Sequence, residues 1–348
     1  MRFKLLIISL LFFLQGLQVS GQELQFSQYF STSLYLNPAF SAIYVEPSFF
    51  VNFRKSLGNN SVLNETNQVS ATFPILINKV DNLPQAGFGM MAYQNRSGFQ
   101  GIFDLSGLLF NYAHNISIGA LNAEVIAIGI QTGYEFYRSN YDQLQWGSNY
   151  NPYYGFDDQQ PVPVDEFNTT SNHLIVNAGA MYYYNRERNF TLYNYSAFSG
   201  FSVTNLNQPY KSFSRLERSR APMLYKYHGG IEFKRRKFNI LPNILLQYQR
   251  RNYNFDGGLY AWYSLRENTF GTGKDIKVVA GTWYRLRDSY IFLIGINYNA
   301  FSMKVSYDLN STLFSDDQVR YSNNHVELSM QYTISKERRI RKISNPLF

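Results

Sequence analysis

Residues 301–310 read FSMKVSYDLN and residues 325–334 read HVELSMQYTI. In each stretch five apolar residues alternate with five polar ones. A strand places successive side chains on opposite faces, whereas a helix groups residues three and four positions apart. Both stretches are therefore predicted to be β-strands with one apolar and one polar face. Their length matches the roughly 9–11 residues that a tilted strand needs to cross a bilayer.

Weaker alternation recurs along the chain and predicts fourteen strands in all. An even number of antiparallel strands is what a closed, single-chain bacterial barrel requires. The fold class is therefore predicted to be all-β, a transmembrane antiparallel β-barrel of about 14 strands. A soluble β-sandwich is the alternative, but it would carry more charge on its outer face. The predicted strands are 48–57, 67–75, 86–96, 103–114, 121–137, 173–185, 193–204, 225–235, 240–251, 255–266, 276–286, 289–298, 301–310 and 324–334.

The composition fits a wall with lipid on one side and water on the other. Charged residues make up 16% of the 348 residues, against about 25% in a typical soluble domain. Aromatic residues make up 18%, and transmembrane barrels collect them at both membrane interfaces. There is no Cys, which argues against a lipoprotein anchor, a Cys-ligated metal site and a Cys nucleophile.

The first 21 residues are predicted to be a signal peptide, cleaved between Gly21 and Gln22. Arg2 and Lys4 precede an apolar run at residues 5–14. A transmembrane anchor is the alternative, but the run is shorter than the roughly 20 residues that a spanning helix needs. No domain boundary is predicted after the leader, so residues 46–334 are expected to form one barrel.

Loop lengths predict which end of the barrel faces outward. With a periplasmic N-terminus, connections from odd to even strands lie outside the cell. The longest gaps fall there, at residues 138–172, 205–224 and 311–323. Long external loops and short periplasmic turns are typical of outer-membrane barrels.

Charged residues are also expected on the inner face of the barrel wall. The alternation points Lys304, Asp308 and Glu327 into the lumen, and Arg54 and Arg285 lie elsewhere on the wall. Two interpretations are open. The charges either pair across strands and stiffen a filled barrel, or they line a pathway for ions or peptides.

The sequence gives little support for an enzyme, and no cofactor or metal site is expected. The four His residues fall in different predicted strands without metal-ligand spacing. A hydrolase assembled from distant strands remains a third alternative. The glycines of AGFGMMAY, residues 86–93, are interpreted as small residues that let barrel strands curve.

Two segments flank the predicted barrel. Residues 22–45 include QFSQYFSTSLYLNPAFSA, an uncharged, aromatic stretch with an Asn-Pro turn. Residues 335–348 form a basic tail with five cations close together, Lys336, Arg338, Arg339, Arg341 and Lys342. The tail is either a solvated charge run or a docking site for an acidic periplasmic partner or lipid headgroups.

The N-terminal stretch resembles the signature of the PorP/SprF family of Bacteroidota, in which Gln-Phe-Ser/Thr-Gln-Tyr/Phe precedes Asn-Pro-Ala-Tyr/Phe. Residues 25–29 match the first half and residues 37–40 the second. The resemblance covers essentially the whole mature chain. Further similar segments are residues 201–213, 241–249, 280–288, 305–313 and 325–334.

The family often has Arg followed by Gln-Trp in the first strand, whereas residues 54–56 here read RKS. The resemblance implies an outer-membrane barrel of the type IX secretion system. It also implies partners: periplasmic ring and peptidoglycan-anchoring components, and a specific secreted or surface-attached cargo such as an adhesin. It implies no catalytic residues. Outer-membrane lipid is expected around the barrel, and nucleic acid is not an expected partner because the net positive charge is modest.

The N-terminal segment is expected to sit in the periplasmic mouth or lumen, as a plug or as a partner contact. Its spacing suggests a helix whose apolar face, with Phe26, Tyr29, Phe30 and Leu34, packs against the inner wall. The candidate partner-binding residues in this segment are Phe26, Tyr29, Phe30, Asn37, Pro38 and Phe40. The five cations of the tail are further candidates. A non-enzymatic role in protein secretion is the preferred function, and a passive porin for small solutes is the alternative.

Overall fold

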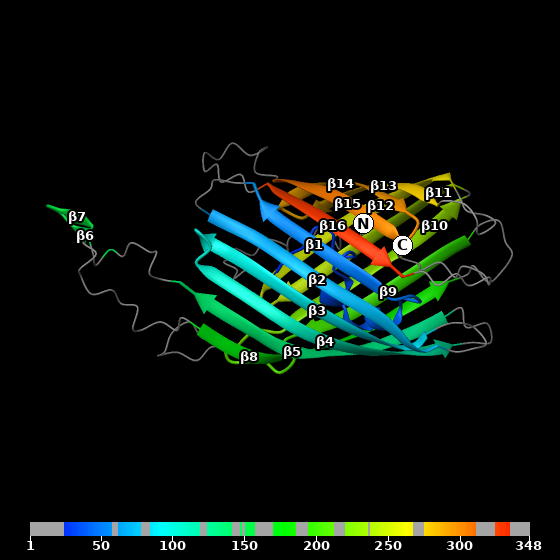
Figure 1. Ribbon diagram of the computed structural model, residues 1–348, viewed down its shortest axis with the longest axis horizontal. Coiled ribbons are helices and arrows are strands. Elements are labelled where there is room, and N and C mark those ends of the chain that lie inside the picture. The colour runs from blue at the N-terminus through cyan, green and yellow to red at the C-terminus, as the bar shows by residue number, and fades with distance from the viewer. Residues whose placement is uncertain are drawn as a thin grey trace, which may run out of the picture.

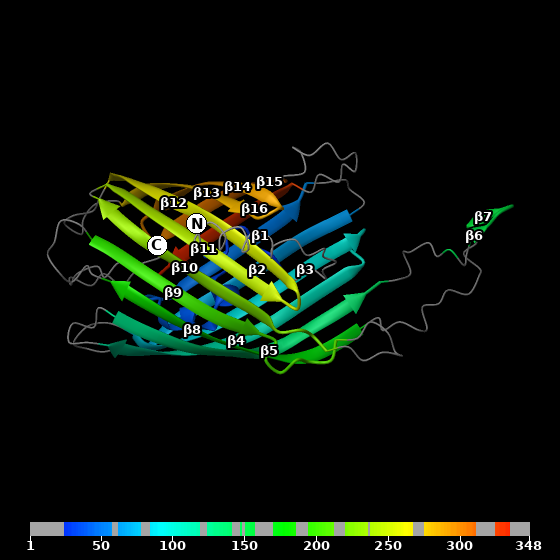
Figure 2. The ribbon, with the colours of Figure 1, turned by 180° about the vertical axis from the view of Figure 1, so that it is seen from behind.

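Fourteen antiparallel strands close into a barrel in the part of the chain that the computed structural model describes (Figure 1 and Figure 2). Two further strands of two residues each pair only with one another. The all-β, closed antiparallel barrel predicted from the alternation is therefore confirmed. The described residues are 24–57, 62–77, 84–118, 124–140, 147, 150–156, 170–185, 194–211, 220–235, 237–266, 275–310 and 324–334.

The elements follow one another around the barrel, with the first strand closing against the last. The helical elements are α2 (Ser33–Leu36) and η1 (Pro38–Ala42). The barrel strands are β1 (Ser48–Ser56), β2 (Val62–Ile77), β3 (Pro84–Phe99), β4 (Phe103–Ile118), β5 (Glu124–Ser139), β8 (Thr170–Asn185), β9 (Asn194–Thr204), β10 (Leu224–Arg235), β11 (Phe238–Gln249), β12 (Asn252–Arg266), β13 (Ile276–Arg285), β14 (Ser289–Tyr298), β15 (Phe301–Asn310) and β16 (His325–Thr333). The small pair is β6 (Tyr150–Asn151) and β7 (Gly155–Phe156).

The two faces of each strand differ as the alternation predicts. In β15 Val305 is 38% exposed on the outer face, whereas Ser306 is 1% exposed on the inner face. In β14 Tyr290 and Tyr298 face outward at the two ends of the strand, the positions where membrane barrels carry aromatic girdles. The outer surface of the barrel is therefore apolar between aromatic borders.

Among the described residues, no helix has the length and apolar character needed to cross a membrane.

The two ends of the barrel differ in their connections. One end, the long-loop end, carries the connections of residues 140–169, 205–223 and 311–324. The other, the short-turn end, carries turns such as residues 299–300 between β14 and β15. At the short-turn end the Ile334 N–H donates to the Pro47 carbonyl at 2.8 Å. The chain therefore enters and leaves the wall side by side.

The two faces can be tested with one cation placed on each side of β14. Ile294 faces outward and is 66% exposed, while Asn297 faces the lumen and is half-buried. We expect Ile294→Arg to destabilise the barrel in lipid by about 2–4 kcal/mol, because the cation is forced into hydrocarbon near the midplane. Asn297→Arg should cost clearly less. Urea unfolding in liposomes measures both, and equal losses would contradict the assignment of faces.

Candidate functional site: the segment inside the barrel

The lumen is occupied by residues 24–47, the lumenal segment, which leads into β1 (Figure 1). It bonds to wall strands on several sides, reaching β16 through Ser27, β8 through Asn37 and β4 through Ala42. From residue 24 to residue 44 every side chain is buried except those of Gln25 and Tyr35, which are partly buried. The lumen is therefore a packed core around this segment.

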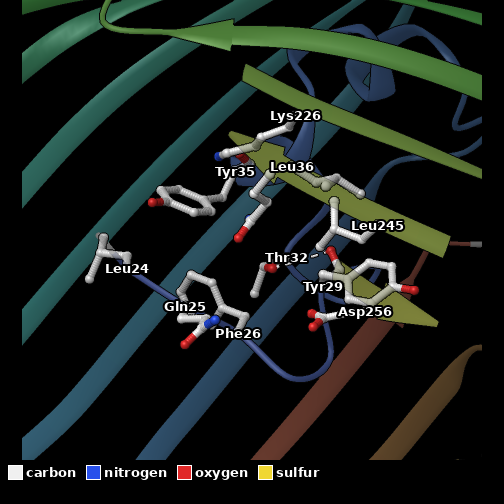
Figure 3. A pocket seen from close by; sticks show the side chains of 11 residues that line it. Leu24, Gln25, Phe26, Tyr29, Thr32, Tyr35, Leu36, Lys226, Leu245 and Asp256 are labelled. Carbon is white, nitrogen blue, oxygen red and sulfur yellow. Dashed lines mark hydrogen bonds between the residues drawn. The ribbon is translucent and has the colours of Figure 1, made fainter. Parts of the chain in front are cut away.

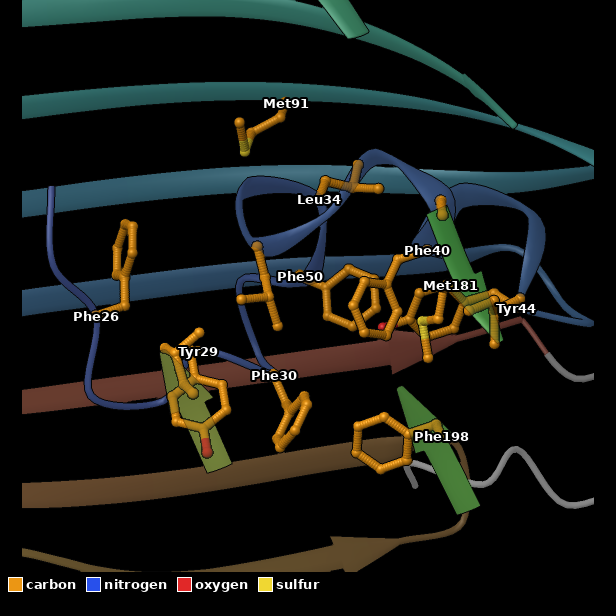
Figure 4. Close-up of a cluster of buried hydrophobic side chains, with 14 of the residues drawn as sticks. Phe26, Tyr29, Phe30, Leu34, Phe40, Tyr44, Phe50, Met91, Met181 and Phe198 are labelled. Carbon is orange, nitrogen blue, oxygen red and sulfur yellow. The ribbon is translucent and has the colours of Figure 1, made fainter. Parts of the chain in front are cut away.

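Aromatic and aliphatic side chains of the segment form one cluster with the wall (Figure 4). Phe30 is 1% exposed and meets Phe198 edge to face at 5.5 Å between ring centroids. Phe40 is fully buried and stacks on the His228 ring at 5.5 Å. The predicted apolar contact with the inner wall is thus present, and Phe26, Tyr29, Phe30 and Phe40 all take part in the cluster.

The expectation that one helix face carries these contacts is wrong. Only α2, Ser33–Leu36, is α-helical; residues 27–32 form bends and turns, and residues 24–26 have no regular structure. The wall surrounds the segment, so apolar side chains are buried in whichever direction they point. One continuous helix is also unnecessary for hydrogen bonding, because side chains of the wall bind some of the segment's backbone groups and short turns within the segment bind others.

Glu327 of β16 holds the start of the segment. Its carboxylate accepts hydrogen bonds from the backbone N–H of Ser27 at 2.7 Å and of Gln28 at 3.1 Å. It also accepts one from the Asn52 side chain at 2.8 Å. The Ser27 hydroxyl donates to Asp308. These charge-assisted bonds fix residues 27 and 28 against β15 and β16.

The side-chain amide of Gln28 is fully buried and bonded at both ends. Its Nε2 donates to the Ser306 hydroxyl at 3.1 Å and to the Glu327 carbonyl at 2.8 Å. Its Oε1 accepts from the Ser329 hydroxyl at 2.5 Å. This position needs a side chain with both donor and acceptor, which explains the second Gln of the N-terminal motif.

Two arginines link the acids that bind the segment. Arg54 Nη2 lies 3.4 Å from Asp308 Oδ2, and Arg54 Nε lies 3.8 Å from Glu327 Oε2. Arg285 Nε lies 3.0 Å from Asp256 Oδ1, and its Nη1 lies 3.7 Å from Asp308. All five side chains are nearly excluded from solvent. Of the two interpretations of the inward charges, pairing across strands is the one found at Arg54, Arg285, Asp308 and Glu327. Lys304, the fifth predicted inward charge, lies with its Nζ 5.9 Å from the centre of the Tyr260 ring.

Carbonyl groups further along the segment are bound by neutral and basic side chains of the wall. Lys226 Nζ donates to the Tyr35 carbonyl at 2.8 Å and lies 3.8 Å from the centre of the Tyr35 ring (Figure 3). Gln131 donates to the Leu34 carbonyl at 3.2 Å. Further donors are Ser202 to Leu36 at 2.7 Å and Asn115 to Ala42 at 2.7 Å. The donors lie on four different strands, β10, β5, β9 and β4.

Two tyrosines of the segment act as buried donors. Tyr44 donates to the Ser33 hydroxyl at 3.0 Å, and Tyr29 donates to the Asn243 side chain. Both side chains are buried, so these bonds fix the two tyrosines within the lumen.

Asn37 and Pro38 form a turn that is bound tightly to the wall. Asn37 Nδ2 donates to the carbonyls of Ala180 at 3.1 Å and Phe201 at 3.3 Å, and its Oδ1 accepts from the Ala39 N–H at 3.0 Å. Asn37 thereby caps η1, which begins at Pro38. The motif is thus a turn, as predicted, and also a bond to β8 and β9.

Glycines of the wall make room for this turn. A Cβ on Gly129 would lie 2.5 Å from the backbone of Pro38 and Ala39. A Cβ on Gly179 would meet the Asn37 side chain, and one on Gly87 would meet the Ser41 backbone. Gly87, interpreted from sequence as a residue that lets strands curve, thus also permits close approach of the segment.

A cavity of about 370 Å³ lies between the segment and the long-loop end. Leu24 and Gln25 line it, together with Asn95, Gln131 and Glu135 of the wall and with residues of the loops. The cavity is therefore bounded on one side by the start of the lumenal segment.

Three polar side chains surround the carboxylate of Glu135 at this cavity. The Tyr93 hydroxyl donates to one carboxylate oxygen of Glu135. His173 Nε2 lies 2.9 Å and Lys211 Nζ lies 3.5 Å from the other oxygen. Lys211 belongs to the loop after β9, so this group ties that loop to the wall.

No group of three or more His, Asp or Glu side chains suited to a metal ion occurs among the described residues.

The structure brings the six N-terminal candidates together in the lumen, where all are buried: Phe26, Tyr29, Phe30, Asn37, Pro38 and Phe40. Whether they bind a partner stays a prediction. The other candidates lie outside the described residues: Lys336, Arg338, Arg339, Arg341 and Lys342 of the tail, and Gly21 and Gln22 at the cleavage site.

Sequence reasoning missed the wall residues that bind the segment: Asn115, Gln131, Ser202, Lys226 and Asn243. Gln131, Ser202, Lys226 and Asn243 occupy lumen-facing positions of predicted strands, so the alternation gives their orientation. Asn115 lies one residue beyond the predicted strand 103–114, because β4 continues to Ile118. It does not give the path of the segment, and without that path their partners are not predictable.

Similarity to solved structures is confined to the fold. The chain resembles CdiB from Acinetobacter baumannii (6% identity, TM-score 0.42, 83% of this chain and 60% of CdiB covered). It also resembles the Pseudomonas putida toluene transporter TodX (8% identity, TM-score 0.44, 90% of this chain and 94% of TodX covered). A third similar structure is a Pseudomonas aeruginosa FadL homologue (9% identity, TM-score 0.40, 88% of this chain and 94% of the homologue covered). A search of curated protein sequences finds no match. A family model described as "Type IX secretion system membrane protein PorP/SprF" matches residues 18–332.

The fit between wall and segment is testable at Gly129. We expect Gly129→Ala to destabilise the barrel by about 1–3 kcal/mol, because the new methyl group collides with backbone that has no room to move. The measurement is the urea midpoint for loss of the folded, heat-modifiable form. Gly229→Ala is the control. Gly229 faces away from the lumen, and its Cβ would lie 3.2 Å from the nearest atom. Equal effects of the two substitutions would contradict the close fit.

Proposed function

The chain belongs to the PorP/SprF family of type IX secretion system membrane proteins, and from this premise we propose that it is a non-enzymatic part of that machinery which acts by binding protein partners. It is an outer-membrane β-barrel. The proposed partners are periplasmic ring and peptidoglycan-anchoring components on one side and a specific secreted or surface-attached cargo, such as an adhesin, on the other.

The observation that carries the proposal is the filled lumen. Residues 24–44 are buried between the walls, and wall side chains bind their backbone at several points. The buried charges of Arg54, Arg285, Asp256, Asp308 and Glu327 are paired with one another, and buried Lys226 binds the segment itself. A passive porin, the alternative function, needs a water-filled lumen. The packed segment disfavours it.

The short-turn end is the proposed contact for the periplasmic machinery. The chain leaves the barrel there, since Ile334 lies beside Pro47. The basic tail, residues 335–348, follows directly in the sequence. Its five cations within seven residues suit an acidic partner, and such an attraction weakens as salt shortens the Debye length to about 8 Å at physiological ionic strength.

Neutralising the tail tests this contact. Replacing Arg338, Arg339, Arg341 and Lys342 with Ser should leave a folded, heat-modifiable barrel. It should lower the recovery of periplasmic partners in pull-downs from outer membranes at least several-fold, and secretion of the cognate cargo should fall with it. The loss of recovery should be largest at low salt, because the contact is electrostatic.

The matched control removes four cations from the opposite end of the barrel, Arg220, Arg250, Arg251 and Arg287, and should leave recovery of the periplasmic partners unchanged. If the tail variant recovers the periplasmic partners and secretes cargo at the normal level, the tail is only a solvated end of the chain and makes no partner contact. Ion conductance of the wild-type protein in planar bilayers, at the level of an open channel, would favour the porin instead.

A further inference from the structure

The barrel wall has two heights. Five neighbouring strands, β2, β3, β4, β5 and β8, have 16 residues each, whereas β13, β14 and β15 have 10 each. About 9–11 residues suffice to cross the bilayer. The five long strands therefore extend beyond it, as a raised wall made of their ends.

The outer face of the raised wall shows at which end this extension lies. Cross-strand register places Glu65, Arg96, Asp104 and Arg138 side by side on four of these strands, next to Lys55 of β1. Arg96 Nε and Asp104 Oδ2 form an ion pair at 3.5 Å. A row of alternating charges does not face hydrocarbon. The raised wall thus stands above the membrane at the long-loop end, around the cavity.

One border of the raised wall is a strand edge that no described strand pairs with. β8 pairs with β5 along its length, but its pairing with β9 stops at Ala178 and Val203. Above that point the Leu206 N–H donates to the Val176 carbonyl at 2.8 Å. Within the described residues, no strand follows beside residues 170–174 of β8.

The side chain of Asn207 shows what this edge binds. Its Oδ1 accepts from the Val176 N–H at 3.1 Å, and its Nδ2 donates to the Leu174 carbonyl at 2.7 Å. An amide side chain here takes the place of the peptide group of a neighbouring strand. Alternate residues of a strand direct their backbone groups to the same side. Thr170 and Asn172 therefore present the same groups further up, where only another extended backbone matches their spacing.

The sequence of this edge lacks the usual protection against pairing. Residues 170–174 read TSNHL, without the Lys or Pro that commonly block exposed edges. The side chains of Thr170, Asn172 and Leu174 are exposed, and His173 on the inner face binds Glu135 beside the cavity. A strand added here would direct alternate side chains toward the cavity.

We infer that the β8 edge at residues 170–174 is a docking site for an extended segment of a partner polypeptide, which adds to the barrel wall as a further strand. Main-chain hydrogen bonds supply the affinity, as in other cases of strand addition. Polar residues of the partner face the cavity around Glu135. The inference rests on the proposed function only in taking the partner to be a polypeptide at the long-loop end.

The test places a photo-cross-linking amino acid, p-benzoylphenylalanine, at Ser171 in cells that secrete cargo. Asn172→Pro removes the N–H that faces the open edge and leaves the bonds to β5, whereas Asn172→Ala keeps the N–H. We expect an adduct with one short segment of another polypeptide, reduced several-fold by Asn172→Pro and unchanged by Asn172→Ala. Heat-modifiable migration verifies that both variants fold.

Thr170→Pro, compared with Thr170→Ala, is the second pair, because Pro is tolerated at the first residue of a strand. Equal adduct yields in the Pro and Ala variants would overturn the inference. So would an adduct only with residues 212–219 of the same chain or with lipid. Suppose that deletion of the whole chain abolishes cargo secretion but the adduct yield does not respond to these substitutions. That result refutes docking at the β8 edge and leaves the proposed function standing. Normal secretion without the chain refutes the proposed function itself.

Discussion

A chain that crosses the inside of a barrel must find a partner for every buried N–H and C=O group. The lumenal segment meets this constraint partly with its own turns, including α2 and η1, and partly with side chains of the wall. Glu327 binds two N–H groups at its start, Lys226 and Gln131 bind carbonyls in its middle, and Asn115 binds one at its end. The inner face of the barrel is thus matched to one path of one segment, and the two fold as a single core.

The same constraint explains why buried charge is concentrated where it is. Removing Glu327 and Asp308 from water is costly, and the cost is offset only when each has close partners. Arg54 lies between them, and the backbone of Ser27 and Gln28 supplies further donors. Such a network contributes little net stability compared with an apolar core. It does favour one position of the segment, because any shift leaves a carboxylate without donors.

The barrel is predictable from sequence because its physical cause is local. Val305 and Ser306 differ in exposure because successive side chains of a strand face lipid and lumen in turn. That alternation can be read directly from consecutive residues. The path of the lumenal segment has no such local cause. Its spacing suggests a helix, yet the backbone takes its hydrogen bonds from residues such as Lys226 that are distant in the chain. Gly129 likewise shows its role only beside Pro38. The sequence allows the motif residues to be identified as important, but it does not show which residues they contact.

The lumenal segment also connects the two ends of the barrel. Leu24 lines the cavity at the long-loop end, while Pro47 lies beside Ile334 at the short-turn end. Between them the segment is bonded to the wall at each turn and held by Asn37 against β8 and β9. A partner that pulled on one end would therefore strain bonds distributed over the whole wall. For the proposed role between a periplasmic machine and a polypeptide outside the cell, this construction favours a rigid anchor over a gate, because no single contact releases the segment.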